Sequence, residues 1–304
     1  MKILITGALG HIGSYVITDL IKVKKIKKIY LLDNLMNDKH NALFNFKSKK
    51  LKFIFGDLTK KEIIKKIPKS DVVIHLASIT NAEKSFENKN AVINNNIGCF
   101  NNIISYCKLN KSKLIHISST SVYGPQKGFV DETEKKLSPR SPYAEVKLSE
   151  ENILIQNKKI KYISLRFGTI SGFSPGMRFH TAVNKFCLNT VLGLKIPIWG
   201  KSTNLYRPYL SLKDASKVFS FIISKNFFPC EIFNILSENK TISEILTIIK
   251  KNKYNPKTHF VNSRILNQDS YKINKSKIES KGLKLNSKIS DDIKVILKKL
   301  TINR

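Results

Sequence analysis

A tyrosine and a lysine four residues apart, Tyr143 and Lys147, have the spacing most suggestive of catalysis in this sequence. On a helix, residues i and i+4 lie on one face, so the two side chains would project together. A lysine ammonium beside a phenol favours the phenolate, which prepares a tyrosine for proton transfer near neutral pH. Ser119, in the hydroxyl-rich run 118–121, could bond the reacting oxygen. The three residues therefore predict an acid–base site.

The spacing itself is weak evidence in a lysine-rich chain, because four of the ten tyrosines have a lysine four residues later. Tyr123 is followed by a glycine and a proline, which disfavour a helix there. Tyr209 lies in a run typical of a strand, and Tyr271 lies in a polar C-terminal segment. Tyr143 alone opens a helix, after a serine and a proline. This context argues against the alternative of an exposed surface pair.

Three glycines, Gly7, Gly10 and Gly13, follow the first predicted strand and open the first predicted helix. They permit a tight turn and let the backbone approach a pyrophosphate at the helix N-terminus. Asp33 ends the second predicted strand 20 residues after Gly13, where a carboxylate bonds adenosine ribose hydroxyls and repels a 2′-phosphate. The pattern predicts NAD rather than NADP. The predicted phosphate loop comprises Gly7, Gly10, His11, Ile12 and Gly13.

Short apolar runs alternate with longer mixed segments over the first half of the chain, which is typical of βαβ units. The runs are rich in β-branched residues without polar alternation, as in strands covered on both faces. We therefore predict an α/β fold, a Rossmann-type doubly wound parallel sheet. Strands are expected at 2–6, 28–32, 51–54, 71–75, 113–118 and 162–167, and helices near 12–21, 60–66, 90–107 and 143–156.

The pattern loosens from Gly168, where we expect a smaller C-terminal α/β substrate-binding region. The expected elements are a helix at 181–192, strands ending at Gly200 and spanning 205–212 and 232–236, and a helix capped by Thr241 or Ser243. The tail from Lys251 is polar and weakly patterned. The predicted division is an NAD-binding domain at 1–167, completed by about 205–236, and a substrate-binding region at 168–204 and 237–304.

The chain carries 54 lysines and arginines against 22 acidic residues, a formal net charge of +32. One interpretation is a binding surface for nucleic acid or another anion. The alternative is that lysines cover solvated faces throughout. We favour the alternative because the basic runs lie at predicted helix ends and turns without aromatic residues to stack bases. A weak, salt-sensitive affinity for polyanions is still expected.

No apolar run approaches the roughly 20 residues that cross a bilayer, and the N-terminus does not resemble a signal peptide. Cys99, Cys107, Cys187 and Cys230 are scattered, with no Cys-x-x-Cys pair. Neither a disulfide framework nor a metal site is therefore expected. These features predict a cytoplasmic protein with no membrane partner.

The residues above resemble the extended short-chain dehydrogenase/reductase family, in its NAD-dependent epimerase/dehydratase branch. The resemblance covers roughly residues 1–240 and rests on motifs in the family's order: TGALGHIG, LLDN, GDL, HLAS, NNNIG, SSTSVYG, SPYAEVK, LRFGTISG and RPYLSLKDA. It implies a nucleotide-sugar substrate, polysaccharide precursor synthesis, and a homodimer formed through the helices at 90–107 and 143–156.

The resemblance also implies roles for individual positions. Ser119, Tyr143 and Lys147 align with the catalytic residues. Cofactor contacts are implied at Asp33, Asn34, Asp57, Leu58, Leu76, Ala77, Ser78 and Asn96, besides the phosphate loop, Tyr143 and Lys147. Substrate contacts are implied at Thr120, Thr169, Arg178, Asn184 and Arg207. Arg207 matches an arginine that grips the diphosphate, as suits a fixed positive fork.

Departures from the family's motifs make some of the family's activities less expected for this chain. Family dehydratases carry an Asp–Glu pair where this chain has Thr120 and Ser121, so the acid and base for eliminating water are missing. Decarboxylating relatives have Glu at Ser121, and 3,5-epimerases use a cysteine that this loop lacks. Thr169 replaces a substrate-contacting asparagine, which implies rearranged diphosphate contacts. His180 is either a substrate ligand or an ordinary loop histidine, and we favour the latter.

A nucleotide-sugar 4-epimerase needs the tyrosine, the lysine and a hydroxyl, and these are all present. We therefore expect inversion at C4 through a transient 4-keto sugar. The alternatives are a 4-keto-sugar reductase that consumes NAD(P)H, a 4,6-dehydratase, and a non-catalytic relative that binds RNA.

Overall fold

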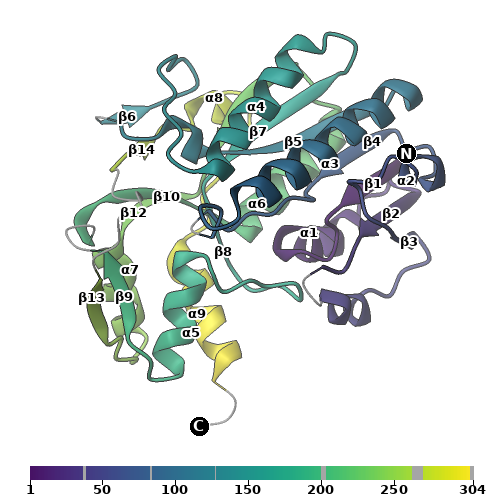
Figure 1. The fold of residues 1–304 in the computed structure, drawn as a ribbon. Helices are drawn as coiled ribbons and strands as arrows, with labels where there is room; N and C mark the ends of the chain where they lie inside the picture. The colour runs from purple at the N-terminus through teal and green to yellow at the C-terminus, as the bar shows by residue number, and fades with distance from the viewer. Residues whose placement is uncertain (37–38, 83, 127, 200–202, 262–269, 302–304) are drawn as a thin grey trace.

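The computed structural model describes residues 1–36, 39–82, 84–126, 128–199, 203–261 and 270–301 (Figure 1). Its largest element is a sheet of seven parallel strands in the order β11-β7-β5-β4-β1-β2-β3. The strands are β1 (Lys2–Thr6), β2 (Lys28–Asp33), β3 (Leu51–Phe55), β4 (Val72–His75), β5 (Lys113–Ser119), β7 (Tyr162–Phe167) and β11 (Glu231–Ile235). The strand order reverses beside β1, so the predicted doubly wound fold is confirmed.

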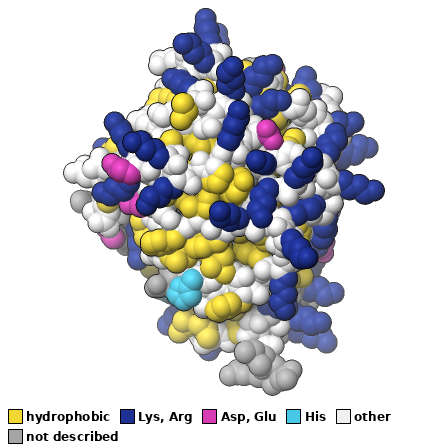
Figure 2. Space-filling view, turned by 90° about the vertical axis from the view of Figure 1, so that its right-hand side faces the viewer, with side chains coloured by type: hydrophobic (Ala, Val, Ile, Leu, Met, Phe, Trp, Pro, Cys, Tyr) yellow, Lys and Arg dark blue, Asp and Glu magenta, His cyan; other side chains and the backbone are white. Residues whose placement is uncertain are grey.

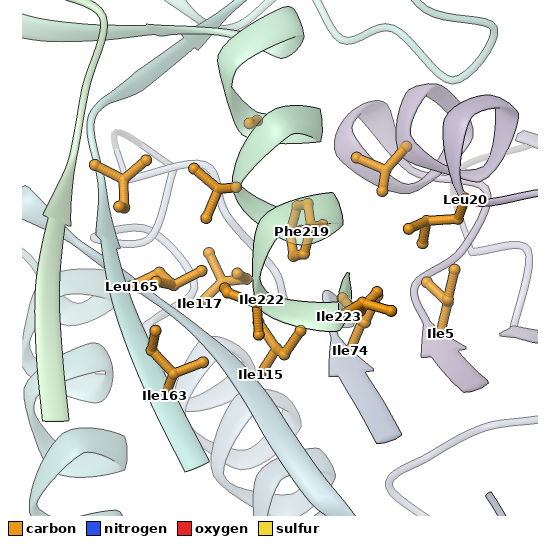
Figure 3. Close-up of a cluster of buried hydrophobic side chains, with 14 of the residues drawn as sticks. Ile5, Leu20, Ile74, Ile115, Ile117, Ile163, Leu165, Phe219, Ile222 and Ile223 are labelled. Atoms are coloured by element: carbon orange, nitrogen blue, oxygen red, sulfur yellow. The ribbon is translucent and has the colours of Figure 1, made fainter. Parts of the chain in front are cut away.

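Helices cover both faces of this sheet, because successive strand residues point to opposite sides and both sides are apolar. The helices are α1 (His11–Leu20), α2 (Ile63–Lys66), α3 (Lys89–Asn110), α4 (Pro142–Gln156) and α6 (Leu212–Lys225). Ile3 and Ile5 pack in the core beneath α1 and α6, whereas Leu4 packs in the core beneath α3 and α4. Figure 3 shows the first of these cores, with Phe219 of α6 among the strand side chains.

Helix α4 begins where the sequence predicts, because Ser141 caps it and Pro142 occupies its first turn. The Ser141 hydroxyl accepts a hydrogen bond from the Ala144 amide at 3.2 Å. This start places Tyr143 in the first turn and Lys147 one turn later, on a helix that packs against β5.

The segments after β7 build two small sheets and a helical layer beside the large sheet (Figure 1). Strand β10 (Tyr206–Ser211) pairs with β8 (Thr169–Ser171) in parallel and with β12 (Glu238–Thr241) in antiparallel, and β9 (Ile196–Trp199) pairs in parallel with β13 (Thr258–Val261). The helices are α5 (Ala182–Val191), α7 (Ile242–Lys251) and α9 (Ile289–Leu300). Thr241 caps α7 in a capping box with Glu244, as one of the two predicted caps.

The expectation of a weakly patterned tail after Lys251 is wrong for its last part. Helix α9 buries Ile289, Ile293, Ile296 and Leu297 in a core shared with α5 and α7. These residues recur at helical spacing and form one apolar face, which the lysines and aspartates between them obscure in the sequence.

Short elements complete the chain. They are β6 (Phe129–Val130) paired with β14 (Lys272–Ile273), α8 (Ser276–Glu279), and the 3-10 turns η1 (Lys39–Asn45) and η2 (Thr120–Tyr123). The predicted strand end at Gly200 lies outside the described residues. Strand β10, expected to complete the Rossmann domain, belongs to the three-stranded sheet, whereas β11 does join the large sheet. In the described part of the chain, no helix is both long and apolar enough to cross a membrane.

Candidate active site

A cavity of about 990 Å³ opens at the carboxyl edge of the large sheet. Its wall contains the last residues of five parallel strands: Thr6, Asp33, His75, Ser119 and Phe167. Open α/β sheets bind their ligands at this edge, near the point where the strand order reverses. The described residues contain no group of three or more His, Cys, Asp or Glu side chains that could hold a metal ion.

The glycine loop leaves no room for side chains, as a pyrophosphate cradle requires. Gly7 has a φ of +62°, and a Cβ there would lie 2.6 Å from the amide nitrogen of Ala77. A Cβ on Gly13 would lie 2.4 Å from the carbonyl oxygen of Ala8. All five predicted loop residues, Gly7, Gly10, His11, Ile12 and Gly13, line the cavity at the N-terminus of α1. The loop therefore fits a dinucleotide phosphate.

Two backbone amides hold the Asp33 carboxylate in place. Its Oδ2 accepts a hydrogen bond from the Leu9 amide at 3.0 Å, and its Oδ1 accepts one from the Leu35 amide at 2.9 Å. Each carboxylate oxygen can accept a second bond, from a ribose hydroxyl. Asn34 lines the cavity beside it. These residues fit the adenosine ribose of NAD.

The segment after β4 forms another part of the wall. Leu76, Ala77 and Ser78 line the cavity, and the amides of Leu76 and Ala77 donate to the Thr6 hydroxyl at 3.2 and 3.3 Å. Asn96 lies outside the lining. Its side chain accepts from the Ile79 amide at 2.8 Å and donates to the Ile79 carbonyl at 3.1 Å. Asn96 therefore positions this segment through the Ile79 backbone, and its cofactor contact stays a prediction.

Two further predicted contact residues also lie outside the lining. Asp57 accepts bonds from the amide and the hydroxyl of Thr59 at 2.9 and 2.8 Å, while its neighbour Leu58 lines the cavity. Asn184 is fully buried, and its side chain donates to the Arg178 carbonyl at 3.0 Å. The Asn184 side chain holds the loop that carries Arg178, and its substrate contact stays a prediction.

The predicted catalytic residues Ser119, Tyr143 and Lys147 all line the cavity. Lys147 Nζ lies 5.9 Å from the centroid of the Tyr143 ring, so the two side chains share a helix face. The Ser119 hydroxyl oxygen accepts from the Ser121 amide at 3.2 Å and from the Ser121 hydroxyl at 2.8 Å. Its own proton is thereby left for a substrate oxygen. Thr120 also lines the cavity.

Lys147 has an anionic partner that sequence reasoning missed. Its Nζ lies 2.7 Å from Glu150 Oε2, and the same oxygen lies 2.9 Å from His116 Nε2. Burial alone would raise the pKa of the Glu150 carboxyl, but Lys147 and His116 more than offset this and lower it to about 2. A glutamate three residues after Lys147, on the same helix face, was the available signal.

The C-terminal elements supply the rest of the wall, including Thr169, Arg178 and Arg207. The Arg178 guanidinium donates to the Thr80 hydroxyl, and its buried Nε has no hydrogen-bond partner. Burial lowers the pKa of Arg178. The Arg207 guanidinium lies 5.3 Å from the centre of the Tyr271 ring. His180 lines the cavity as well, and burial together with Arg178 lowers its pKa to about 3, so it is neutral.

Positive charge dominates the cavity. In the described part of its wall, one carboxylate, that of Asp33, faces six basic side chains: Lys39, Lys84, Lys147, Arg178, Lys185 and Arg207. Such a wall raises the local concentration of anions and favours phosphorylated ligands. Basic side chains also spread across a whole outer face of the molecule, as Figure 2 shows, without gathering into one stripe.

The family model for the NAD dependent epimerase/dehydratase family matches residues 3–235. The chain therefore belongs to this family, and the predicted NAD-dependent enzyme with NAD as cofactor is confirmed. The family's nucleotide-sugar chemistry agrees with the cationic cavity.

Known proteins place the chain among epimerases and dehydratases. It is 27% identical to the trifunctional UDP-glucose 4,6-dehydratase/UDP-4-keto-6-deoxy-D-glucose 3,5-epimerase/UDP-4-keto-L-rhamnose-reductase of Arabidopsis thaliana, over 96% of this chain and 46% of that protein. It is 28% identical to an uncharacterized UDP-glucose epimerase of Bacillus subtilis, over 82% of this chain and 81% of that protein. The chain thus spans about half the length of the first of these relatives.

A solved structure shows the same architecture. The UDP-glucuronic acid 4-epimerase from Bacillus cereus, in complex with UDP-glucuronic acid and NAD, superposes with a TM-score of 0.87 at 26% identity, over 99% of this chain and 100% of that chain. This similarity agrees with the doubly wound sheet and with the C-terminal elements described above.

Proposed function

We propose that the protein is a nucleotide-sugar 4-epimerase, an isomerase that inverts C4 through a transient 4-keto sugar. The observation that carries the proposal is the convergence of Ser119, Tyr143 and Lys147 on the cavity that the glycine loop and Asp33 also line. This convergence supports an acid–base group beside a dinucleotide site.

In the proposed reaction, the Tyr143 phenolate takes the proton of the sugar 4-hydroxyl and later returns it. The Lys147 ammonium stabilises the phenolate, and the Ser119 hydroxyl donates a hydrogen bond to the sugar O4. When bound, NAD supplies the chemistry of accepting a hydride from C4 and giving it back. The sugar presents its other face before the return, so C4 is inverted and no external reductant is consumed.

The hydroxyl loop supports epimerisation over dehydration. Removing water from C5 and C6 needs an acid and a base near the sugar, and Thr120 and Ser121 are neutral hydroxyl residues at pH 7. Ser121 instead donates to Ser119, which aligns the catalytic hydroxyl. We assign the substrate diphosphate to Arg178 and Arg207, which line the cavity as Thr169 does.

The experiment is to incubate the purified protein with UDP-, GDP- and dTDP-hexoses without added cofactor and to identify products by NMR. We expect a C4-inverted product from at least one nucleotide series, and none from Tyr143→Phe. No inverted product across the panel would contradict the proposal. Net oxidation of NAD(P)H with a 4-keto sugar would instead identify a reductase.

The remaining expectations belong to the same proposal. We expect a cytoplasmic homodimer formed through α3 and α4, acting in the supply of polysaccharide precursors. Residues 1–167 with about 212–236 would bind the cofactor, and 168–211 with 237–304 would bind the substrate, because β10 belongs to the three-stranded sheet. Nucleic acid would bind weakly and without sequence preference, because the outer basic side chains in Figure 2 are dispersed.

A further inference from the structure

We propose that Glu150 is a positioning residue that acts through Lys147 and holds Tyr143 in its neutral form to higher pH. The inference rests on the proposed function only in taking Tyr143 as the acid–base group. It concerns a carboxylate that does not line the cavity and lies behind the catalytic lysine.

The geometry fixes Glu150 on the buried side of Lys147. The Lys147 and Glu150 side chains are 4% and 1% exposed, and their charged atoms lie 2.7 Å apart. His116 on β5 approaches the same carboxylate oxygen at 2.9 Å through its Nε2. The Nδ1 of His116 lies 2.9 Å from the Ser164 hydroxyl on β7. Two strands therefore anchor the carboxylate against rotation.

His116 is hydrogen-bonded through both ring nitrogens, to Glu150 Oε2 at its Nε2 and to the Ser164 hydroxyl at its Nδ1. Lys147 places its ammonium 2.7 Å from the same Glu150 oxygen and faces the carboxylate charge directly. The other oxygen of Glu150, Oε1, is buried and has no hydrogen-bond partner in the structure, so solvent does not screen this carboxylate.

Other titratable groups lie near this pair, and the second buried carboxylate of α4, Glu151, is paired with Arg166 at 2.7 Å instead of with Lys147. On α3, burial raises the pKa of Cys99 to about 12, so its thiol is neutral. At the end of β4, burial lowers the pKa of His75 to about 3, so its imidazole is neutral as well. Arg178 acts on Tyr143 from the loop after β8 and is a cation. The negative charge of Asp57 contributes to the raised pKa of Cys99.

Two effects on the catalytic pair follow from a buried negative charge. Burial alone would lower the pKa of Lys147, but the Glu150 carboxylate more than reverses this and raises it. A Tyr143 phenolate raises the pKa of Lys147 as well, so the ammonium is favoured whenever that phenolate forms, with or without Glu150. The same carboxylate offsets much of the positive charge that Lys147 presents to Tyr143, so the phenol ionises less readily than beside a lone ammonium.

The test is to follow Tyr143 by NMR in protein labelled with ¹³Cζ-tyrosine, without substrate, over a pH series. The ten tyrosines give at most ten signals, and the Tyr143 signal is the one missing from Tyr143→Phe. In Glu150→Gln we expect its ionisation midpoint to move to lower pH by about one unit, which is tenfold in proton affinity. Glu150→Met removes the same charge with an apolar side chain. The test can therefore be made with whichever of the two variants folds.

Glu145→Gln is the matched control, because it removes the same charge from an exposed position on the same helix. We expect no shift there. A midpoint in both Glu150 variants that is unchanged, or that moves to higher pH, would overturn the inference. Because no sugar is present, this outcome is separate from failure of the proposed epimerase activity.

Discussion

Two buried acidic side chains, Glu150 behind the candidate active site and Asp292 among the C-terminal elements, are equally hidden but differently partnered. Glu150 is 1% exposed and Asp292 is 5% exposed. Lys147 lies 2.7 Å from Glu150, and the pKa of Glu150 is lowered to about 2. Asp292 accepts bonds from the hydroxyls of Ser171 and Ser211 at 2.5 and 2.9 Å, and burial raises its pKa to about 6.

The difference shows that the partner, and not burial, decides the state of an interior carboxyl group. A cation beside Glu150 keeps both groups charged where the chemistry is proposed to occur. Neutral hydroxyls beside Asp292 suit a structural role, because they join the ends of β8 and β10 to α9. The two regions therefore respond in opposite directions to pH and to loss of a partner.

The largest expected effect is that of removing the cation. Lys147→Met leaves the Glu150 charge buried without its ammonium, and we expect the free energy of unfolding at pH 7 to fall by about 3 to 5 kcal/mol. Ser171→Ala removes one hydroxyl from Asp292 and should cost about 1 to 3 kcal/mol. Urea denaturation measures both. The double variant Lys147→Met/Glu150→Gln should recover part of the stability lost in Lys147→Met. Equal losses in Lys147→Met and Ser171→Ala would contradict the difference between the two carboxylates.

The next effect is the pH dependence of stability, which should have opposite signs at the two sites. The folded-state pKa of Asp292 is raised to about 6, so its contribution is full below its ordinary value near 3.8 and is lost as the pH rises through about 6. The change is on the order of 3 kcal/mol. Glu150 contributes above its ordinary value near 4.5 and loses its contribution as the pH falls through about 2.

Asp292→Asn and Glu150→Gln separate the two contributions. Urea midpoints between pH 4 and pH 7 should fall less steeply with rising pH in Asp292→Asn than in the parent protein. In Glu150→Gln the urea midpoint should depend on pH between pH 4 and pH 7 as it does in the parent protein, because Asp292 is unchanged. If Asp292→Asn left the slope unchanged, the raised pKa of Asp292 would be contradicted.

A smaller effect tests whether the C-terminal elements serve the substrate alone. Arg178→Gln removes a charged donor from the cavity wall, and we expect kcat/KM for the nucleotide sugar to fall about 10- to 100-fold. The affinity for NAD, measured by calorimetry, should change little. Arg140→Gln, at an exposed position outside the lining, is the control. A loss of NAD affinity equal to the loss in kcat/KM would contradict this division of roles.

The smallest expected effect is the difference in stability between alanine variants of two glycines, one from each region. Gly7 and Gly193 have φ values of +62° and +70°, but a Cβ on Gly7 meets the Ala77 backbone, whereas a Cβ on Gly193 meets nothing within 4 Å. In both alanine variants the left-handed backbone should lower the free energy of unfolding by about 1 to 2 kcal/mol. Gly7→Ala should lose about 1 to 3 kcal/mol more through the clash. Thermal denaturation with and without NAD measures the difference, and equal losses would show that the loop is not tightly packed.

The large sheet was predictable from sequence because each of its strands is a short, continuous apolar run. The strands at 2–6 and 162–167 agree with the structure at both ends, four others differ by one residue at one end, and the strand expected at 232–236 begins and ends one residue earlier. The motif at Gly7, the end of β2 at Asp33 and the cap at Ser141 each carry a local signal. These signals, together with the family resemblance, predict that Ser119, Tyr143 and Lys147 lie in one site, and all three line the cavity.

The C-terminal core and the buried partners were not predictable in the same way. The apolar face of α9 is completed by α5 and α7, which come from distant parts of the sequence. Asn96 and Asn184 were expected to touch ligands, but their side chains bond to backbone that only the folded chain brings near. His116 contacts Glu150, which lies 34 residues later in the sequence, and no local sequence pattern predicts that contact.

The most direct test of the central claim uses a UDP-hexose carrying deuterium at C4, incubated in ordinary water with the purified protein and no added cofactor. If Tyr143 moves the hydroxyl proton while the C4 hydrogen travels as a hydride and returns, the C4-inverted product keeps its deuterium. Tyr143→Phe should give no product. Inverted product that has exchanged its deuterium with water, or undiminished product from Tyr143→Phe, would contradict the account.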